Sequence, residues 1–265
     1  YKNKFIFKKI DINNSKKISR IVSENKINVI IHLAAKIDAY ESINKENLYK
    51  INNYEATKNL IDLAIKNKLK QFIFASSAAV YGDVNNCYCS ESNRLNPINP
   101  YGKFKYLAEN YLKKNQNKLN FTILRFFNIA GINKEFYPFF YKRRSLFFSL
   151  FNYLINKQKY FFVNRSLYKT KDNSTVRDYI HINDICRIIY KSIYLKNLET
   201  ANCGRGKKVS VLQFIDKFRK KFKIKIDIKS KYPRKGDPSC VIANNLVIKK
   251  KFKNFEFSSF DLILK

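Results

Sequence analysis

Gln71-Phe72-Ile73-Phe74-Ala75-Ser76-Ser77 is a short apolar run, rich in aromatic residues, that ends in a small residue and two hydroxyls. Two similar runs occupy residues 29–33 and 121–127, and they lead into Ala34-Ala35 and Asn128. Continuous apolar runs of this length are typical of parallel strands that are buried on both faces. Helical periodicity is found before and between the runs, at residues 15–25, 53–67 and 101–113. Strands that alternate with helices predict an α/β fold with a doubly wound parallel sheet.

The ends of these strands predict a ligand site. In doubly wound sheets, ligands lie beyond the carboxyl ends of the strands. The small side chains of Ala34, Ala35 and Ala75 would let a bound molecule approach the backbone closely, and Ser77 and Asn128 would offer it hydrogen bonds.

A tyrosine and a lysine open the helix that follows the second of these runs. Tyr101 and Lys105 are four residues apart and therefore share one helix face. A phenol has a reference pKa of about 10, and a nearby cation favours its ionised form. The pair therefore suits a phenolate base assisted by an ammonium group. On spacing alone, an exposed tyrosine and a solvated lysine would be the better interpretation. The preceding strand and its hydroxyls favour the functional interpretation.

Six motifs in order carry a resemblance to a known family. They are His32-Leu33-Ala34-Ala35, residues 72–82, Pro100-Tyr101-Gly102-Lys103-Phe104-Lys105, Arg125-Phe126-Phe127-Asn128, Val176-Arg177-Asp178-Tyr179-Ile180-His181 and Pro233-Arg234-Lys235-Gly236-Asp237. With these motifs the chain resembles the extended short-chain dehydrogenases/reductases, and among them the nucleotide-sugar epimerases that include UDP-glucose 4-epimerase. The resemblance extends over nearly the whole chain.

The resemblance implies NAD-dependent epimerisation of a nucleotide sugar at carbon 4, most simply the interconversion of UDP-glucose and UDP-galactose. Tyr101 resembles the catalytic base that takes the proton of the sugar 4-hydroxyl while the cofactor accepts the hydride. Ser77 is similar to the serine that hydrogen-bonds the reacting oxygen, and Lys105 to the residue that lowers the tyrosine pKa and binds the nicotinamide ribose. A positioned base contributes a factor of roughly 10² to 10⁴ to the rate.

The resemblance also implies two sets of binding residues and no metal site. Cofactor contacts are expected at Asp11, Ile12, Leu33, Ala34, Ala35, Lys36, Ile37, Asn52 and Phe127, in addition to the three catalytic residues. Substrate contacts are expected at Asn128, Arg177, Arg234 and Asp237. Arginine suits a diphosphate because its planar fork can donate two charge-assisted hydrogen bonds.

The chain departs from the family pattern in two ways. It has only 6 glycines and no glycine-rich phosphate turn. We therefore expect it to begin near the third strand of the family's fold, to bind NAD weakly, and to leave the side chains of Val29, Ile31 and Phe72 partly in water. In the pocket, Ile37 stands where many members have lysine, and Asn164-Arg165 replaces the usual Phe-Gly, so uracil or sugar selectivity is expected to differ.

Two regions are expected along the chain. Residues 1–131 are predicted to form a partial Rossmann-like NAD-binding domain, and residues 132–265 a smaller α/β substrate-binding region. Within the second region, an irregular lid is expected at 133–175 with a buried or substrate-covering helix at 145–155. Helices are expected at 184–195 and at 211–222, the latter with Ser210 as its N-cap. His32 and His181 are expected to be satisfied, non-catalytic side chains.

Composition limits the remaining possibilities. The net charge of +33 would suit nucleic acid, but the lysines are spread through every segment beside abundant Asn, Ile, Tyr and Phe, a set explained by A/T-rich codons. No specific nucleic-acid partner is therefore expected. No run of about 18 apolar residues is present, so no membrane span is expected. Five cysteines without paired spacing argue against a zinc site or a disulfide framework and favour the cytoplasm. A homodimer is left open.

Three functions remain compatible with the sequence: the 4-epimerase, a related nucleotide-sugar epimerase or dehydratase, and a non-catalytic fragment unable to hold NAD. A dehydratase would carry an Asp-Glu acid/base pair after the second strand, where this chain has Ala78-Ala79. The missing glycine turn favours the non-catalytic fragment.

Overall fold

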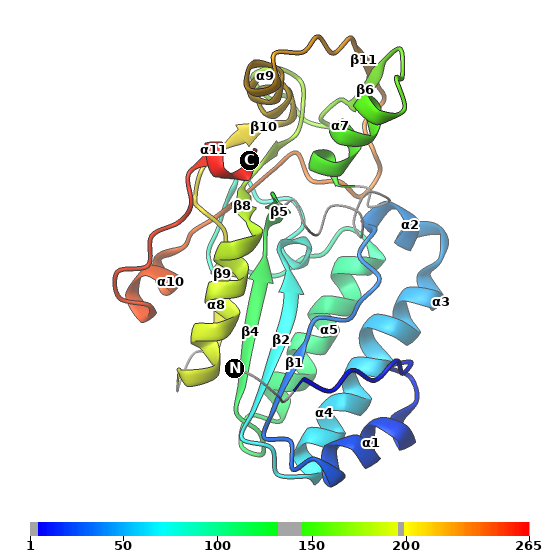
Figure 1. Ribbon diagram of the computed structural model, residues 1–265, viewed down its shortest axis with the longest axis vertical. Helices are drawn as coiled ribbons and strands as arrows, with labels where there is room; N and C mark the ends of the chain where they lie inside the picture. The colour runs from blue at the N-terminus through cyan, green and yellow to red at the C-terminus, as the bar shows by residue number, and fades with distance from the viewer. Residues whose placement is uncertain (1–4, 132–144, 196–198, 265) are drawn as a thin grey trace.

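The centre of the molecule is a four-stranded parallel sheet (Figure 1). The computed structural model describes residues 5–131, 145–195 and 199–264. The strands lie in the order β1 (Val29–His32), β2 (Gln71–Ser77), β4 (Phe121–Phe126) and β9 (Thr200–Cys203), each parallel to its neighbour. The predicted α/β fold with a parallel sheet is confirmed.

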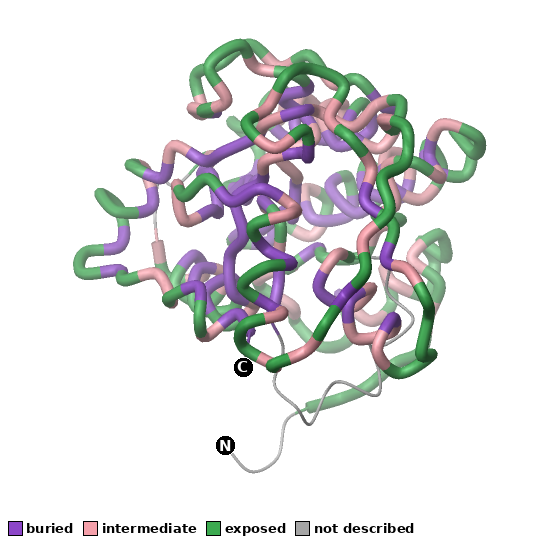
Figure 2. The backbone as a smooth tube through the Cα atoms, turned by 90° about the horizontal axis from the view of Figure 1, so that it is seen from above, coloured by how far each residue is buried: buried purple, intermediate pink, exposed green. Residues whose placement is uncertain are grey.

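Helices cover both faces of this sheet, and β2 shows why. Phe72 and Phe74 pack with α1 (Ser15–Glu24), α4 (Ala56–Lys66) and α5 (Pro100–Lys114), whereas Ile73 packs with α8 (Ile182–Tyr194) on the opposite face. Side chains alternate across a strand, so a strand between two helical layers must be apolar at every position. The view from above shows the buried backbone at the middle of the molecule and exposed loops around it (Figure 2).

The predicted helices of the first half occur close to their expected bounds. The expected helix at 53–67 is preceded by a π-helical turn, η1 (Lys50–Glu55), that continues into α4. Two short helices, α2 (Ala39–Asn44) and α3 (Glu46–Tyr49), fill the connection from β1. These differences arise because hydrophobic periodicity reports which face of a helix is buried but not whether the helix is α or π.

Helix α5 begins with three residues that fix its place on the sheet. The Asn99 side chain caps it by accepting from the Gly102 amide at 2.8 Å, and Pro100 occupies the first turn. A Cβ atom on Gly102 would lie 2.4 Å from the Ala79 carbonyl oxygen. Only glycine therefore allows the first turn of α5 to lie so close to η2 (Ala78–Val80), the 3-10 turn after β2.

The second half of the chain builds several smaller sheets around its own core. Its elements are β5 (Asn128–Ala130), α7 (Leu146–Ile155), β6 (Phe161–Asn164), β7 (Val176–Arg177), β8 (Tyr179–His181), β10 (Val209–Ser210), α9 (Val211–Phe222), β11 (Ile228–Lys231), β12 (Cys240–Ala243), α10 (Leu246–Lys251) and α11 (Phe260–Ile263). Phe147, Phe214, Phe218 and Phe260 form the centre of that core. The expected helices at 145–155, 184–195 and 211–222 are confirmed, the last with a capping box at Ser210.

In the described part of the segment expected to be irregular, 133–175, the helix α7 was expected, but the strand β6, which pairs with β11, was not. Residues 132–144 lie outside the described residues. The boundary at residue 131 stays a prediction. Each side of it contributes a strand to a sheet of the other side. Strand β9 joins the large sheet, whereas β3 (Tyr88–Cys89) pairs with β12.

The cysteine prediction is wrong for one pair, because Cys87 and Cys240 form a disulfide. These residues are 153 positions apart and their Cα atoms are 5.0 Å apart. They meet because β3 and β12 lie side by side, and the Cys87 carbonyl accepts from the Ile242 amide at 2.9 Å. A pairing created by strand topology leaves no local spacing signal in the sequence.

The expected exposure of apolar side chains near the edge of the sheet is partly correct. Ile31 on the edge strand β1 is 38% exposed, and Phe5, Ile6 and Phe7 before it are also exposed. Phe72 is wholly buried, contrary to expectation, because β1 and β4 flank β2 and the helices cover it.

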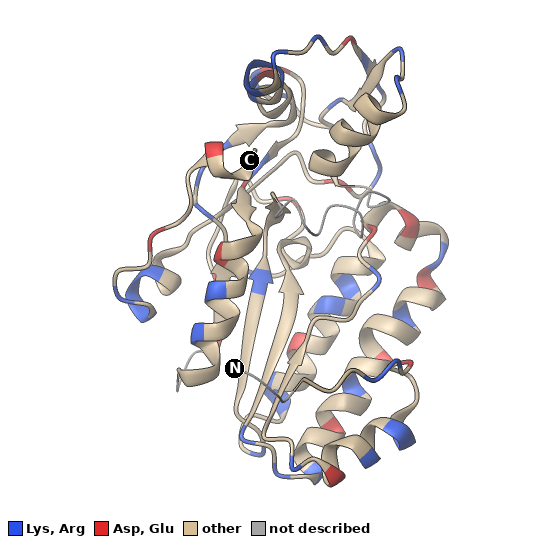
Figure 3. Cartoon of the chain, viewed as in Figure 1, with Lys and Arg blue, Asp and Glu red and all other residues tan. Residues whose placement is uncertain are grey.

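Lysine and arginine are distributed over helices and loops of both halves (Figure 3). None of the helices in the described ranges is long and apolar enough to cross a membrane.

His32, at the end of β1, is buried and uncharged. Its Nε2 lies 2.8 Å from the Thr57 hydroxyl, which itself donates to the Asn53 carbonyl, so Nε2 carries the proton and donates to Thr57. Burial and the nearby Lys105 charge lower the His32 pKa to about 3. His181 is also hydrogen-bonded, since its Nδ1 accepts from the Asn183 amide at 3.1 Å. Both imidazoles are satisfied, as expected.

His32 should make the fold sensitive to acid. The unfolded chain binds this proton below about pH 6.5 and the folded chain only near pH 3, so stability falls as pH decreases through that window. Between pH 6.5 and 5 the wild type should lose about 1.6 kcal/mol more than His32→Gln, because the slope is half of about 1.4 kcal/mol per pH unit at pH 6.5 and approaches the full value below it. Urea unfolding at several pH values measures this difference. Equal pH dependence of the two proteins would show that His32 titrates normally in the fold.

Candidate active site

A cavity of about 2260 Å³ lies beyond the carboxyl ends of β1, β2 and β4. The sheet side of its wall consists of Leu33, Ala34 and Ala35, then Ala75, Ser76 and Ser77, then Phe126, Phe127 and Asn128. The opposite side comes from α7, from Asn164 and Arg165, and from residues 230–237. Ligand pockets usually measure about 300–1,000 Å³. This cavity therefore has room for two ligands side by side.

The three predicted catalytic residues lie together in the wall of this cavity. Tyr101 and Ser77 both line it, and the Ser77 side chain lies close enough to the Tyr101 phenol to lower the phenol pKa. The Ser77 Oγ also accepts from the Ala79 amide at 3.2 Å, which fixes the turn after β2. Lys105 donates from Nζ to the Ala75 carbonyl at 2.6 Å, and its ammonium lies 4.7 Å from the centre of the Phe74 ring.

Burial dominates the electrostatics of this group. It raises the pKa of the Tyr101 phenol, and the contact with Ser77 lowers that pKa only in part. Burial also lowers the pKa of Lys105 to about 7, against the opposing effect of the Glu109 carboxylate. The expected lowering of the Tyr101 pKa by Lys105 is not found in this arrangement, because the ammonium is directed at the Ala75 carbonyl.

The residues predicted to bind the cofactor are only partly brought together. Leu33, Ala34, Ala35, Ile37 and Phe127 line the cavity, whereas Asp11, Ile12, Lys36 and Asn52 are not part of its lining. The main chain of Lys36 is held by Asn53, which accepts from its amide and donates to its carbonyl, each at 2.8 Å. Asp11 and Asn52 are hydrogen-bonded to a third side chain outside the cavity lining: Asn13 Nδ2 donates to Asp11 at 3.0 Å and to Asn52 at 3.5 Å.

These residues fit a dinucleotide at the strand ends. Ala34 and Ala35 after β1 and Ala75 near the end of β2 leave the backbone accessible, and the cavity lies along the ends of all three strands. Lys105, Ser77 and Tyr101 lie in the same wall and add hydrogen-bonding groups to it.

The predicted substrate residues divide between the cavity and the fold. Asn128, Arg234 and Asp237 line the cavity. Arg177 is buried outside its lining and forms an ion pair with Asp237, while its Nη1 donates to the Val176 carbonyl at 2.9 Å. Arg177 therefore orients a cavity residue and does not itself face the cavity.

The prediction missed further side chains of the wall. Arg165, Lys231 and Lys235 add three cations to Arg234, and Asp38 and Tyr40 line the opposite end near β1. Arg165 had a signal in the sequence, because it stands where the family has glycine. The lysines had none, since one lysine cannot be distinguished from many others in this chain.

Comparison with known proteins agrees with this geometry. The model of the NAD dependent epimerase/dehydratase family matches residues 1–204. The chain belongs to this family. The UDP-glucose 4-epimerase of Mycoplasma genitalium is 36% identical over 261 residues, covering 92% of this chain and 75% of that protein. The expected family resemblance and the expected NAD dependence are thereby confirmed.

Solved structures of epimerases share the fold. The UDP-Glc/GlcNAc 4-epimerase of Campylobacter jejuni is 28% identical, with a TM-score of 0.80 over 98% of this chain and 81% of that one. The UDP-glucose 4-epimerase of Bifidobacterium longum, solved with NAD+ and UDP, is 25% identical, with a TM-score of 0.86 over 97% of this chain and 80% of that one. Family membership is therefore supported by sequence and by fold.

The different positions of Arg177 and Arg234 predict different mutant behaviour in this epimerase-family chain. Arg234→Ala should weaken UDP binding by about 1.5–3 kcal/mol, or roughly ten- to a hundredfold, because it removes one charge-assisted contact. Arg177→Ala should weaken UDP binding and also lower the free energy of unfolding, because it removes the partner of Asp237 and a buried side chain. Calorimetric titration with UDP and urea unfolding measure the two effects. Arg94→Ala, at an exposed arginine outside the cavity wall, is the control for charge alone. Loss of stability in Arg234→Ala, or none in Arg177→Ala, would contradict the assignment.

Proposed function

We propose that this chain epimerises a nucleotide sugar at carbon 4 with NAD, and that UDP-glucose and UDP-galactose are its substrate pair. The observation that carries the proposal is the meeting of Tyr101, Ser77 and Lys105 in one cavity wall beyond the ends of the parallel strands. The names of the similar proteins support the same reaction.

Tyr101 is proposed to remove the proton of the sugar 4-hydroxyl and to return it at the end of the reaction. Ser77, whose side chain lies beside the phenol, is proposed to hold the reacting oxygen close to it. Bound NAD supplies the acceptor and donor of the hydride at carbon 4. The residues proposed to hold it are Leu33, Ala34, Ala35, Ile37 and Phe127 along the strand ends, with Lys105 at the ribose.

The protonation states of Tyr101 and Lys105 are proposed to be coupled. Burial disfavours both a lone phenolate and a lone ammonium, and it shifts both pKa values toward the neutral forms. A phenolate beside an ammonium is a paired state, in which each charge stabilises the other. Tyr101 is thus expected to act as a base when Lys105 is charged.

The nucleotide half of the substrate is proposed to lie against the basic side of the cavity. Arg165, Lys231, Arg234 and Lys235 come from two adjacent segments and suit a diphosphate. Asp237, held by Arg177, is a hydrogen-bond acceptor suited to ribose hydroxyls. Asn128, the first residue of β5, lines the same cavity and is proposed to contact the sugar. The homodimer and the cytoplasmic location stay predictions.

Replacing the proposed base tests the function directly. With saturating NAD and UDP-galactose, Tyr101→Phe should retain less than about a hundredth of the wild-type turnover, since a positioned base supplies roughly 10² or more. UDP-glucose formation, followed with a coupled dehydrogenase, is the measurement. Tyr111→Phe removes the phenol oxygen of another tyrosine of α5, one that donates to Asp62 away from the cavity, and should keep its activity. Turnover by Tyr101→Phe above about a tenth of wild type would exclude Tyr101 as the base. No conversion by the wild-type chain would reject the function.

A further inference from the structure

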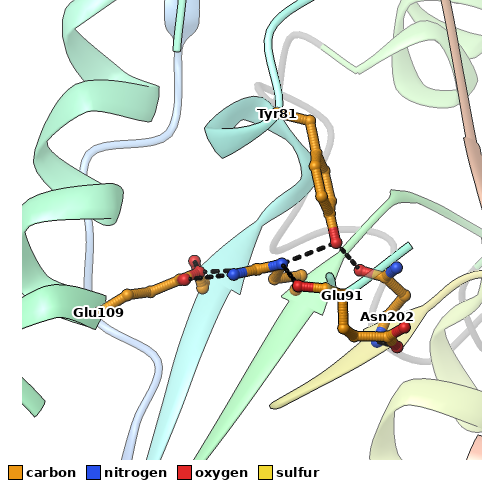
Figure 4. Close-up of polar contacts among 6 residues, drawn as sticks. Tyr81, Glu91, Glu109 and Asn202 are labelled. Atoms are coloured by element: carbon orange, nitrogen blue, oxygen red, sulfur yellow. Dashed lines mark hydrogen bonds and ion pairs between the residues drawn. The ribbon is translucent and has the colours of Figure 1, made fainter. Parts of the chain in front are cut away.

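A buried ion pair lies directly behind the three proposed catalytic residues. Glu109 of α5 and Arg125 of β4 are both fully buried. The guanidinium donates twice to the carboxylate, from Nε to Oε1 at 3.0 Å and from Nη2 to Oε2 at 2.7 Å. Figure 4 shows this two-pronged contact at the centre of a chain of polar side chains. Neither residue lines the cavity.

The same carboxylate holds the end of β2. The Ser76 hydroxyl donates to Glu109 Oε1 at 2.5 Å. Tyr101, Lys105 and Glu109 are spaced four residues apart on one face of α5. Lys105 donates to the Ala75 carbonyl, Glu109 accepts from Ser76, and the Tyr101 phenol lies beside Ser77. Three successive residues of β2 therefore face three successive turns of α5, and two of them are hydrogen-bonded to it.

Arg125 extends this attachment to the far side of Ser77. Its Nη1 donates to the Tyr81 hydroxyl at 2.7 Å, and that hydroxyl donates to Asn202 Oδ1 at 2.7 Å (Figure 4). Tyr81 ends the 3-10 turn that begins after Ser77. The ion pair thus holds the chain on both sides of the serine, through Ser76 before it and Tyr81 after it.

The charges around Lys105 are unbalanced without this carboxylate. Titratable groups that act on Lys105 or stand beside it are Glu109 and Tyr101 on its own helix and His32 at the end of β1. His32 is neutral, since its pKa is about 3, and Tyr101 is protonated. Among the residues that the structure describes, Glu109 is the one anion that acts on Lys105, and it also pairs with the buried Arg125.

We propose that Glu109, fixed by Arg125, is a positioning residue of the active site: it holds Ser76 and hence Ser77 against α5, and its charge keeps the Lys105 ammonium protonated. The pair does more than stabilise the fold. An ion pair that acted on stability alone would leave the kcat of the folded enzyme unchanged when the Ser76 contact is removed. The kinetic part of this inference depends on the proposed function, whereas the titration part does not.

Glu109→Gln tests the charge. The amide keeps the shape of the side chain but removes the anion, so the pKa of Lys105 should fall from about 7 by about one unit or more. Carbon-13 NMR of lysine labelled at Cε measures this pKa, and the Lys105 resonance is identified by its absence in Lys105→Met. Glu109→Asp keeps the negative charge, so its Lys105 pKa should lie closer to the wild-type value than to that of Glu109→Gln. Asp184→Asn, at another fully buried carboxylate bonded to Ser258 and Arg187, is the control and should leave it unchanged. An unchanged Lys105 pKa in a folded Glu109→Gln protein would overturn the electrostatic role.

Ser76→Ala tests the positioning and keeps the ion pair, so it remains available if Glu109→Gln does not fold. It should lower kcat by about tenfold or more with little change in KM, because Ser77 and the phenol lose their alignment while the binding residues stay in place. The Lys105 pKa should stay near its wild-type value. Ser192→Ala, which removes another fully buried serine hydroxyl, one that donates to the Ile188 carbonyl, is the matched control. Equal kcat in Ser76→Ala and wild type would overturn the positioning role. Absence of activity in the wild type would reject the proposed function without affecting the titration result.

Discussion

The attachment of α5 to the carboxyl end of β2 is the constraint on which the rest of the site depends. It requires a glycine at position 102, because a Cβ there would lie 2.4 Å from the Ala79 carbonyl oxygen. It also requires a carboxylate at position 109 in the interior, with Arg125 as its counter-ion. Removing one partner of such a pair typically costs about 3–5 kcal/mol, because the other charge is left uncompensated. Close backbone approach and a buried ion pair together fix the distance between a helix and a strand.

The same burial that fixes the geometry determines the chemistry of the ionisable groups. Tyr101, Lys105 and His32 are each shifted toward the neutral form, and desolvation is the main cause for all three. Burial therefore disfavours an isolated charge on any of these three side chains. Because the pKa of Lys105 is about 7, this side chain can gain or lose a proton near neutral pH.

The cavity depends on the chain crossing between its two halves. Strand β9, from the second half of the chain, completes the large sheet. Strand β3, from the first half, pairs with β12 of the smaller part. The disulfide between Cys87 and Cys240 lies at that second crossing. Because each half supplies strands to the other, the strand ends on one side of the cavity and the basic segment 230–237 on the other are held in one framework.

The sequence by itself determined the parallel sheet, most of its helices, and the grouping of Tyr101, Lys105 and Ser77. Apolar runs and helical periodicity are local signals of burial, and the carboxyl ends of parallel strands necessarily lie at one edge. Only the tertiary structure decided that Arg177 lies outside the cavity wall and pairs with Asp237, which lines it. The same holds for the disulfide between Cys87 and Cys240 and for the bonds of Glu109 to Arg125 and Ser76. These contacts join residues from different elements, and a single sequence has no periodic signal for them. Their geometry is set by how strands and helices pack, which local pattern does not specify.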